Sequence, residues 1–512
     1  MFPFSKKKNN SNPNDEPEKV TIYKEIDKNE EYTKKIFSAD INKDFTFRTL
    51  TANYCQKKTY IFFYSSIVNS EKIYNGIVRP LLEADGKTIN NIITIESLTE
   101  IKSFDKVFDQ INSGKAVVFI DGETTAYSVD VADFQARKVG KAENERSVKG
   151  PKEAFTESIG VNVSLLRKRF HNQKLIAQTM LVGSRSKLEV SVMYVSDLVD
   201  QEILRNLQKR IESLSVDNIS TIELLEQYLE ERPYSLFPTI LYTERPDYAA
   251  QFIEDGYIVL IMDNSSAALI LPATFWSFFH SPEDRYSRFL FGNFTRLLRM
   301  LAFAITILSS ATYIAVTNFH SEMIPPDLLL SITSARERVP IPLFLEVIIM
   351  EIAFELIRES GLRIPNPLGP TIGIVGALII GQAAVEAGII SPIIVIVAAL
   401  SGLTSFSIAN TSLNHSVRIS RFLFIISASL FGMLSLVGAL VLWVFYMSSV
   451  KSFGVSYFAP LSPKYKSTGD MYFRNIIKHE FWRPGQVNPT DKTKKNPNNK
   501  GDSTNEKNKF KS

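Results

Sequence analysis

The sequence predicts a soluble α/β region of two related subdomains, followed by an all-α membrane domain with several spans. Residues 1–290 have mixed charge, and a strand–helix–hairpin pattern occurs twice within them. Long apolar runs then extend from Met300 to Tyr446. The predicted segments are a polar, disordered N-terminal segment (1–45), a first subdomain (46–140), a linking amphipathic helix (141–185), a second subdomain (186–290), a membrane domain (291–450) and a basic, partly disordered C-terminal tail (451–512).

The soluble part looks duplicated. "KTYIFFYSSIVNSEKIYNGIVRPLLE" and "KLEVSVMYVSDLVDQEILRNLQKRIESL" each place a strand-like run before a helix-like one. Each is followed later by two β-rich runs that flank a turn, Asp121-Gly122 or Asp263-Asn264, and such turns favour hairpins. We expect two α/β subdomains at roughly 46–135 and 186–274, related by duplication. The alternative is two unrelated units that share a common motif.

The regions around these units are predicted from composition. "GPKEAFTESIGVNVSLLRKRF" reads as an amphipathic helix with Pro151 near its start. The polar stretches Lys6–Glu18 and Arg483–Ser512 lack apolar periodicity, so we expect both to be disordered tails. No apolar run follows "MFPFSKKKNN", and we therefore expect the soluble part to stay in the cytoplasm.

No motif in the predicted soluble half suggests catalytic activity. It contains no phosphate-binding loop, dinucleotide fingerprint, zinc-protease motif or nucleophile elbow, and the chain's five histidines are scattered. Asp121 and Asp263 are better explained by turns than by acid catalysis. A single cysteine excludes an internal disulfide, and a net charge of +4 is too small to suggest nucleic acid. We therefore expect no enzyme activity, metal or cofactor.

The apolar half predicts four spans. They lie near residues 297–316, 369–389, 393–409 and 422–447. Arginines precede the first span and lysines follow the last, so we expect both tails to be cytoplasmic.

A further apolar segment at 340–360 carries four carboxylates. On a helix Glu351, Glu355 and Glu359 share one stripe, and Glu346 lies on another side. Such a stripe is costly against lipid, so we expect an interfacial or re-entrant helix whose acidic side faces water or protein. Arg358 is the only cation within the segment, and an acidic stripe beside water would attract cations. The alternative is a surface helix with a Glu355–Arg358 pair.

The span at 369–389 combines two stripes. Small residues recur every four positions, at Gly369, Gly373, Ala377 and Gly381, which permits close packing of another helix. Gln382 and Glu386 form a polar stripe beside them. We expect these two side chains to face a water-lined conduit; packing by a neutral carboxylic acid is the alternative.

Several motifs of this sequence resemble those of a known protein family. They are "PATFWSFFHSPEDRYSRF", "FHSEMIPPDLLLSITSARERVPIP", "GPTIGIVGALIIGQAAVEAGIISP" and "SFGVSYFAPLSP", in that order along the chain. Over about residues 145–463 the sequence resembles the GerA family, the A subunits of bacterial spore germinant receptors. It departs modestly where the family often has a proline and this chain has Ala409.

The resemblance implies a nutrient sensor in the spore inner membrane. Its partners would be a transporter-like B subunit, a lipoprotein C subunit, membrane lipid and further copies of itself around a cation-releasing pore. It also leaves open an A-type protein that amplifies ion release without its own nutrient. A solute carrier and a scaffold without a pore are the alternatives from other classes.

Overall fold

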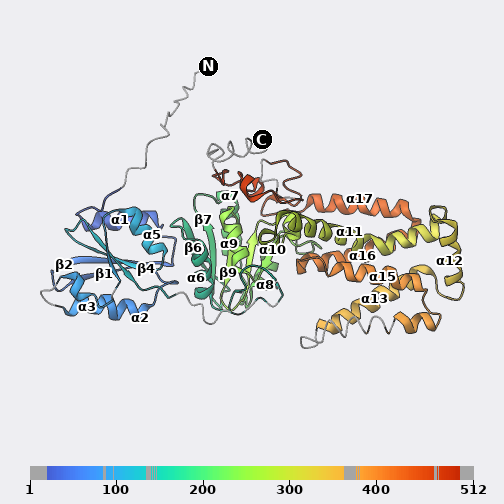
Figure 1. The fold of residues 1–512 in the computed structure, drawn as a ribbon, viewed down its shortest axis with the longest axis horizontal. Helices are drawn as coiled ribbons and strands as arrows, with labels where there is room; N and C mark the ends of the chain where they lie inside the picture. Colours follow the sequence, from blue (N-terminus) through green and yellow to red (C-terminus); the bar gives the residue numbers. More distant parts are fainter. Residues whose placement is uncertain are drawn as a thin grey trace, which may run out of the picture.

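In the computed structural model, two sheet units and a helical bundle lie in a row along the long axis (Figure 1). The structure describes residues 20–495 except 85–87, 96, 134–139, 141, 143, 146, 363–375, 377–378, 380, 466–469 and 471.

The first subdomain is a five-stranded antiparallel sheet in the order β1-β2-β4-β5-β3. Its elements are α1 (Ile26–Ile36), β1 (Phe45–Ala52), β2 (Lys57–Tyr64), α2 (Ser70–Ile73), α3 (Arg79–Glu83), α4 (Ile89–Ile92), β3 (Leu98–Ile101), α5 (Phe104–Asn112), β4 (Lys115–Ile120) and β5 (Ala126–Asp130). The Asp121-Gly122 hairpin is confirmed: β4 pairs with β5, and Gly122 has a φ of +82°, which favours glycine.

Helix α1 corrects the prediction of a disordered segment at 1–45. Ile26 at its start and Phe37 just after its end are buried in the first core. Two further buried positions of the helix, Asn29 and Thr33, are polar, so its buried face does not show as an apolar stripe in the sequence.

The second subdomain repeats this plan. Its sheet has the order β6-β7-β9-β10-β8, which equals the first order with every number raised by five. Its elements are α6 (Ile159–Arg169), β6 (Leu175–Val182), β7 (Leu188–Val195), α7 (Gln201–Glu212), α8 (Ile222–Leu229), β8 (Leu241–Thr243), α9 (Pro246–Glu254), β9 (Ile258–Met262), β10 (Ala268–Leu271) and α10 (Pro282–Tyr286). The expected common plan is therefore observed, and duplication as its origin stays a prediction.

The linking region at 141–185 differs from the prediction at both ends. Helix α6 begins at Ile159, well after Pro151, and β6 at 175–182 belongs to the second sheet. The Asn162 side chain bonds the backbone of Thr156, with 2.7 Å to its N–H and 2.5 Å to its carbonyl. These bonds satisfy the backbone N–H and carbonyl of Thr156, so the chain before α6 does not need to be helical.

Arg167 of α6 joins the two subdomains. It is buried, pairs with Asp44, and donates to Asn42 Oδ1 at 3.1 Å. Its guanidinium also lies 3.8 Å from the ring centre of Tyr64, so a helix of the linking region is fastened into the first subdomain.

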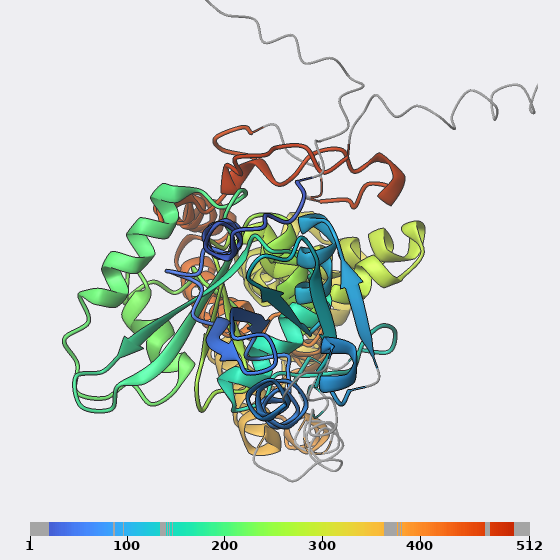
Figure 2. The same ribbon diagram turned by 90° about the vertical axis from the view of Figure 1, so that its left-hand side faces the viewer.

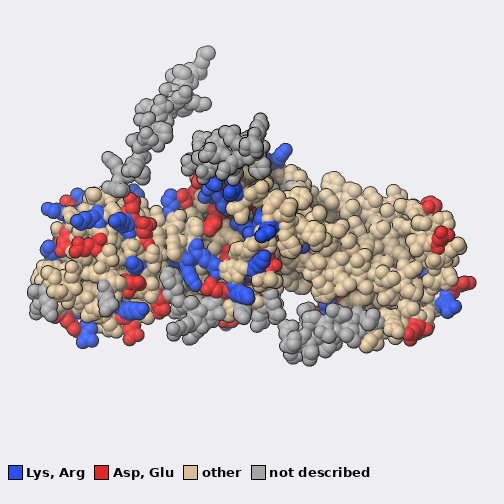
Figure 3. Space-filling view, viewed as in Figure 1, with Lys and Arg blue, Asp and Glu red and all other residues tan. Residues whose placement is uncertain are grey.

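The bundle follows α10. Its helices are α11 (Phe289–Phe319), α12 (Pro326–Arg336), α13 (Leu343–Leu362), α15 (Pro392–Ser405), α16 (Thr411–Phe431) and α17 (Met433–Ser449). Among the described residues α11 alone is both long and apolar enough to cross a bilayer, and α15 and α17 are shorter apolar helices. The face of the bundle seen in Figure 3 is largely uncharged, with charges gathered at its far end. Apolar surface of this extent is typical of a lipid or protein contact.

The expected single span at 422–447 is wrong. Helix α16 ends at Phe431, and α17 begins at Met433 and runs back along it. Trp443 Nε1 donates to Ser420 Oγ at 3.3 Å, and Ser435 Oγ donates to the Ser427 carbonyl at 2.6 Å. Gly432 turns the chain with φ 62° and ψ −134°, a conformation that is essentially restricted to glycine.

We expect Gly432→Ala to lower the unfolding free energy by about 1–3 kcal/mol, because the turn is strained for any other residue. The added Cβ would also lie 2.7 Å from Phe319 Cβ. Gly438→Ala is the matched control, since nothing lies within 4 Å of its added Cβ. Thermal unfolding of the purified protein in detergent measures both variants, and equal melting temperatures would contradict the expectation.

The C-terminal segment, residues 451–495, corrects the prediction of a basic, partly disordered tail. Its hairpin of β11 (Lys451–Ser452) and β12 (Val455–Ser456) is followed by packed irregular chain. Phe453, Val455 and Ala459 are buried in the core around β6–β10. Figures 1 and 2 show the described part of the segment, in red, over the outside of the molecule. The second subdomain is therefore built from two separate stretches of sequence.

Candidate functional site

The interior of the bundle contains a buried ion-pair network. Arg421 of α16 is 1% exposed and lies 2.8 Å from both Glu351 Oε2 and Glu355 Oε1 of α13. Arg418, one turn earlier on α16, donates from Nε to Glu355 Oε1 at 3.1 Å. Two helices that are distant in sequence are thus held together by charge.

Hydroxyl groups extend this network to two more helices. Ser401 of α15 accepts a hydrogen bond from Arg421 Nη1 at 2.9 Å, and Ser310 of α11 donates to Glu351 Oε1 at 2.5 Å. Arg358 of α13 donates to the Gly402 carbonyl at 3.2 Å, near the end of α15. The network therefore connects α11, α13, α15 and α16.

Two carboxylates of the expected acidic stripe face protein and are paired with arginines. Glu351 and Glu355 point into the bundle, and Glu359 is exposed. The sequence argument counted Arg358 alone against three carboxylates, but α16 supplies two further arginines. The structure therefore removes the reason to expect a surplus of negative charge on this stripe. The sequence argument overlooked Arg418 and Arg421, two arginines three residues apart just before an apolar run, as possible partners of these carboxylates.

Glu346 lies apart from this network, as the sequence predicted. It is buried, accepts a hydrogen bond from the Ser391 N–H at 3.1 Å, and lies 3.8 Å from Arg336 Nε. Its Oε1, Arg336 Nε and the hydroxyls of Ser391 and Tyr313 have no hydrogen-bond partner among the described residues. Buried polar groups of this kind are normally satisfied by bound water.

Gln382 and Glu386 lie on the surface of the bundle. Residues 381–386 are helical, and Gln382 Nε2 donates to Glu386 Oε1 at 3.0 Å. Both side chains are exposed, so within one chain they do not line an internal cavity. Their position on one stripe is confirmed, and their place in a conduit stays a prediction.

The small-residue stripe is described at one position. Gly381 is buried, and an added Cβ would lie 3.0 Å from Val395 Cγ1 of α15. A larger residue there would press α15 away, which agrees with a close helix contact. Gly369, Gly373 and Ala377 lie outside the described residues.

A second group of buried ion pairs connects the start of α11 to α10. Asp284 is buried and accepts from Arg296 Nε at 3.0 Å and from Arg299 Nη1 at 2.9 Å. Burial alone would raise the pKa of Asp284, but these two arginines hold it below its usual value. Arg296 and Arg299, expected as a flank at the membrane surface, thus bind a carboxylate of the soluble part.

Arg474 attaches the C-terminal segment at the same place. It is buried and donates to the backbone carbonyls of Asp284 and, at 3.3 Å, of Ser287. The Asn293 side chain of α11 bonds the backbone of Arg474, 2.6 Å to its N–H and 3.2 Å to its carbonyl. The second subdomain, α11 and the C-terminal segment therefore meet in one joint.

No cluster in the part of the chain that the structure describes brings three or more histidine, cysteine, aspartate or glutamate side chains together as a metal site. The absence of catalysis, metal and cofactor stays a prediction.

Comparison with known proteins agrees with the motifs. The profile of the family described as "Bacillus/Clostridium GerA spore germination protein" matches residues 31–486. "Spore germination protein KA" of Bacillus subtilis (strain 168) is 36% identical over 85% of this chain and 81% of its own length. "Spore germination protein GerLA" of Bacillus cereus is 32% identical over 84% and 89%, and "Spore germination protein A1" of Bacillus subtilis (strain 168) is 32% identical over 85% and 90%.

A solved structure is also similar to part of this chain. It is the N-terminal domain of the A subunit of the Bacillus megaterium spore germinant receptor GerK3, 24% identical, with a TM-score of 0.40 over 50% of this chain and 98% of that one. The family profile covers most of the sequence, and relatives that are 32–36% identical match 84–85% of it, so the chain belongs to the GerA family of spore germination proteins.

Proposed function

We propose that this chain is the A subunit of a nutrient germinant receptor in the spore inner membrane, and that several copies form a cation-conducting pore. Family membership supports the receptor. The exposed Gln382–Glu386 pair on the bundle surface carries the proposal of a pore.

The surroundings of Glu386 explain why an oligomer is needed. The nearby Ile379 and Ile389 are exposed, and a carboxylate beside such side chains is costly in lipid. A water-filled lumen between copies accommodates it. Repeated around a ring, Glu386 gives the ring of carboxylates that is typical of cation channels. The B and C subunits that the family implies would pack outside this ring.

The C-terminal segment supports the topology. Phe453 and Val455 are buried in the second subdomain, so that subdomain and the chain after α17 lie on the same side of any membrane the bundle crosses. The number of crossings must then be even. We propose that α16 and α17 are separate passes within an even number of crossings, and that both ends are cytoplasmic.

Glu386 tests the pore. Glu386→Gln removes the charge at similar size, and Glu386→Leu also dries the pathway, so we expect cation release to fall in both and further in the second, by about tenfold or more. The measurement is cation efflux from spores after nutrient addition, per unit of the protein in the membrane. Normal efflux from a fully assembled Glu386→Leu variant would refute the conduit.

Two further variants separate conduction from assembly. Glu322→Gln changes an exposed carboxylate near α12 and should leave efflux unchanged. Gly381→Leu should instead reduce the amount of assembled protein, because the new side chain meets Val395. If Gly381→Leu assembles normally but conducts poorly, the small stripe belongs to the conduit and not to packing.

A further inference from the structure

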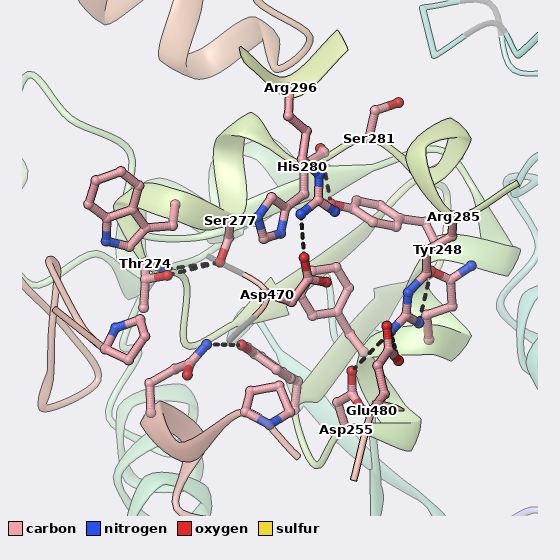
Figure 4. Close-up of a pocket in the computed structure, with 17 residues that line it drawn as sticks. Tyr248, Asp255, Thr274, Ser277, His280, Ser281, Arg285, Arg296, Asp470 and Glu480 are labelled. Carbon is pink, nitrogen blue, oxygen red and sulfur yellow. Dashed lines mark hydrogen bonds and ion pairs between the residues drawn. The ribbon is translucent and has the colours of Figure 1, made fainter. Parts of the chain in front are cut away.

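A cavity of about 70 Å³ lies in the joint between the second subdomain, α11 and the C-terminal segment. Figure 4 shows Asp470 among Arg296, His280 and Tyr248, with Glu480 and Asp255 beside Arg285. Aromatic rings, among them Trp276 and Tyr257, form other parts of the wall. The bundle's ion-pair network contributes nothing to this cavity, and neither do Gln382 and Glu386.

Two oxygen atoms on residues of this wall lack a hydrogen-bond donor among the described residues. They are Glu480 Oε1 and Gln486 Oε1, both buried. Glu480 as a whole is only 8% exposed. The Gln486 amide group donates to Tyr257 Oη at 3.0 Å, which fixes the amide and leaves its oxygen for another partner. Both atoms are acceptors, so the missing partner must donate hydrogen bonds or carry positive charge.

The neighbouring cations compensate Glu480 poorly. Arg285 lies 3.5 Å from Glu480 Oε2 and 4.0 Å from Asp255 Oδ2, so one guanidinium is shared by two carboxylates. Asp255 also has Lys494, whose Nζ is 2.7 Å away. Burial raises the pKa of Glu480 although Arg285 and Lys494 act to lower it. Glu480 is thus the carboxylate of this group with the weakest partner.

We propose that the cavity binds a small monovalent cation, either an alkali ion or the primary ammonium group of a small molecule. Such a cation supplies the partner that an acceptor oxygen on this wall lacks, and it adds to the compensation of the Glu480 charge, which Arg285 provides only in part at 3.5 Å. The aromatic walls attract cations as well. A cavity needs only about 10–15 Å³ of this kind of volume to hold one water molecule, so about 70 Å³ has room for a partly hydrated alkali ion or for a small primary ammonium compound.

The position of the site gives the cation a structural role. Glu480 and Gln486 come from the C-terminal segment, Tyr257 and Trp276 from the second subdomain, and Arg296 from α11. A cation bound between them holds the segment against the subdomain and against the start of the long helix. This site is separate from the proposed pore and does not depend on it.

The test is thermal unfolding of the purified full-length protein in detergent at constant ionic strength. Choline chloride, whose quaternary ammonium group has no N–H to donate to the two acceptor oxygens, is replaced stepwise by potassium, sodium or methylammonium chloride, and glycine is added separately. We expect the melting temperature to rise and saturate with at least one small cation. A response to the alkali ions alone identifies an inorganic site, and a response to methylammonium or glycine alone identifies an ammonium site.

Variants connect the response to the cavity. Glu480→Gln removes the charge at constant size and should abolish the response, and Gln486→Met, which removes the second oxygen, should weaken it. Glu212→Gln, an exposed carboxylate of α7, is the matched control and should respond like the unaltered protein. If Glu480→Gln does not fold, the Gln486→Met result decides. Equal effects of all salts, or an unchanged response in the variants, would show that the cavity holds water only.

Discussion

Replacing Arg421 by leucine is expected to destabilise the folded protein by about 3–5 kcal/mol, among the largest effects of any single substitution in this chain. The substitution leaves Glu351 buried without a cation and leaves Glu355 with Arg418 as its closest partner. An uncompensated carboxylate in the bundle interior is costly, so helices α13 and α16 should separate. Denaturant unfolding in detergent, with the amount of protein in the membrane, measures the effect.

Two controls show that the loss comes from buried charge. The surface pair of Arg185 and Asp217 has side chains 82% and 67% exposed, so Arg185→Ala should cost less than about 1 kcal/mol. The double variant Glu351→Leu with Arg421→Leu should recover most of the lost stability, because it removes both members of the buried pair. An Arg421→Leu protein as stable as the unaltered chain would disprove the structural role of the network.

Replacing Asp284 by alanine is expected to cost about 3 kcal/mol or more and to loosen the joint. Arg299 would lose both of its contacts to this carboxylate, while Arg296 would keep only Asp470. The side chain also accepts the Ser281 N–H in the capping box of α10, and that bond would be lost. The C-terminal segment should then detach more readily, because the lost capping box no longer holds the backbone carbonyl of residue 284, to which Arg474 donates.

Limited proteolysis detects this detachment directly. The described segment 472–495 should become cleavable in Asp284→Ala while the sheets remain resistant. Glu283→Gln, at the preceding position of the same helix, is the matched control and should leave the segment protected. Equal protection in both variants would mean that the hairpin at 451–456 suffices to hold the segment.

The features that the sequence predicted correctly are those that depend on residues close together in the chain. Turn chemistry at Asp121-Gly122 and at Asp263-Asn264 depends on neighbouring residues, and both hairpins form. The repeated order of strand, helix and hairpin is also a local pattern, and it correctly predicted two units with the same plan. The spacing of Gln382 and Glu386 predicted side chains that meet, and they do.

The missed features depend on distant or single residues. Arg421 reaches Glu351 across 70 positions, and no local periodicity encodes such a contact. Gly432 breaks an apolar run that otherwise reads as one helix, because an isolated glycine is usually tolerated. Phe453, Val455 and Ala459 complete a core whose other members end near position 271. Charge compensation and core completion arise from tertiary packing, which a pattern within one segment does not contain.

The late position of Phe453, Val455 and Ala459 has a consequence for biosynthesis. These residues leave the ribosome only after α17, whereas the strands they cover are made before α11. While the bundle is being synthesised, the newly made second subdomain therefore carries an open apolar face, the condition in which chains aggregate or bind chaperones. The core of the second subdomain can be completed only after the whole bundle has been made. A chain truncated within the bundle would therefore keep that apolar face exposed, and proteases could recognise it.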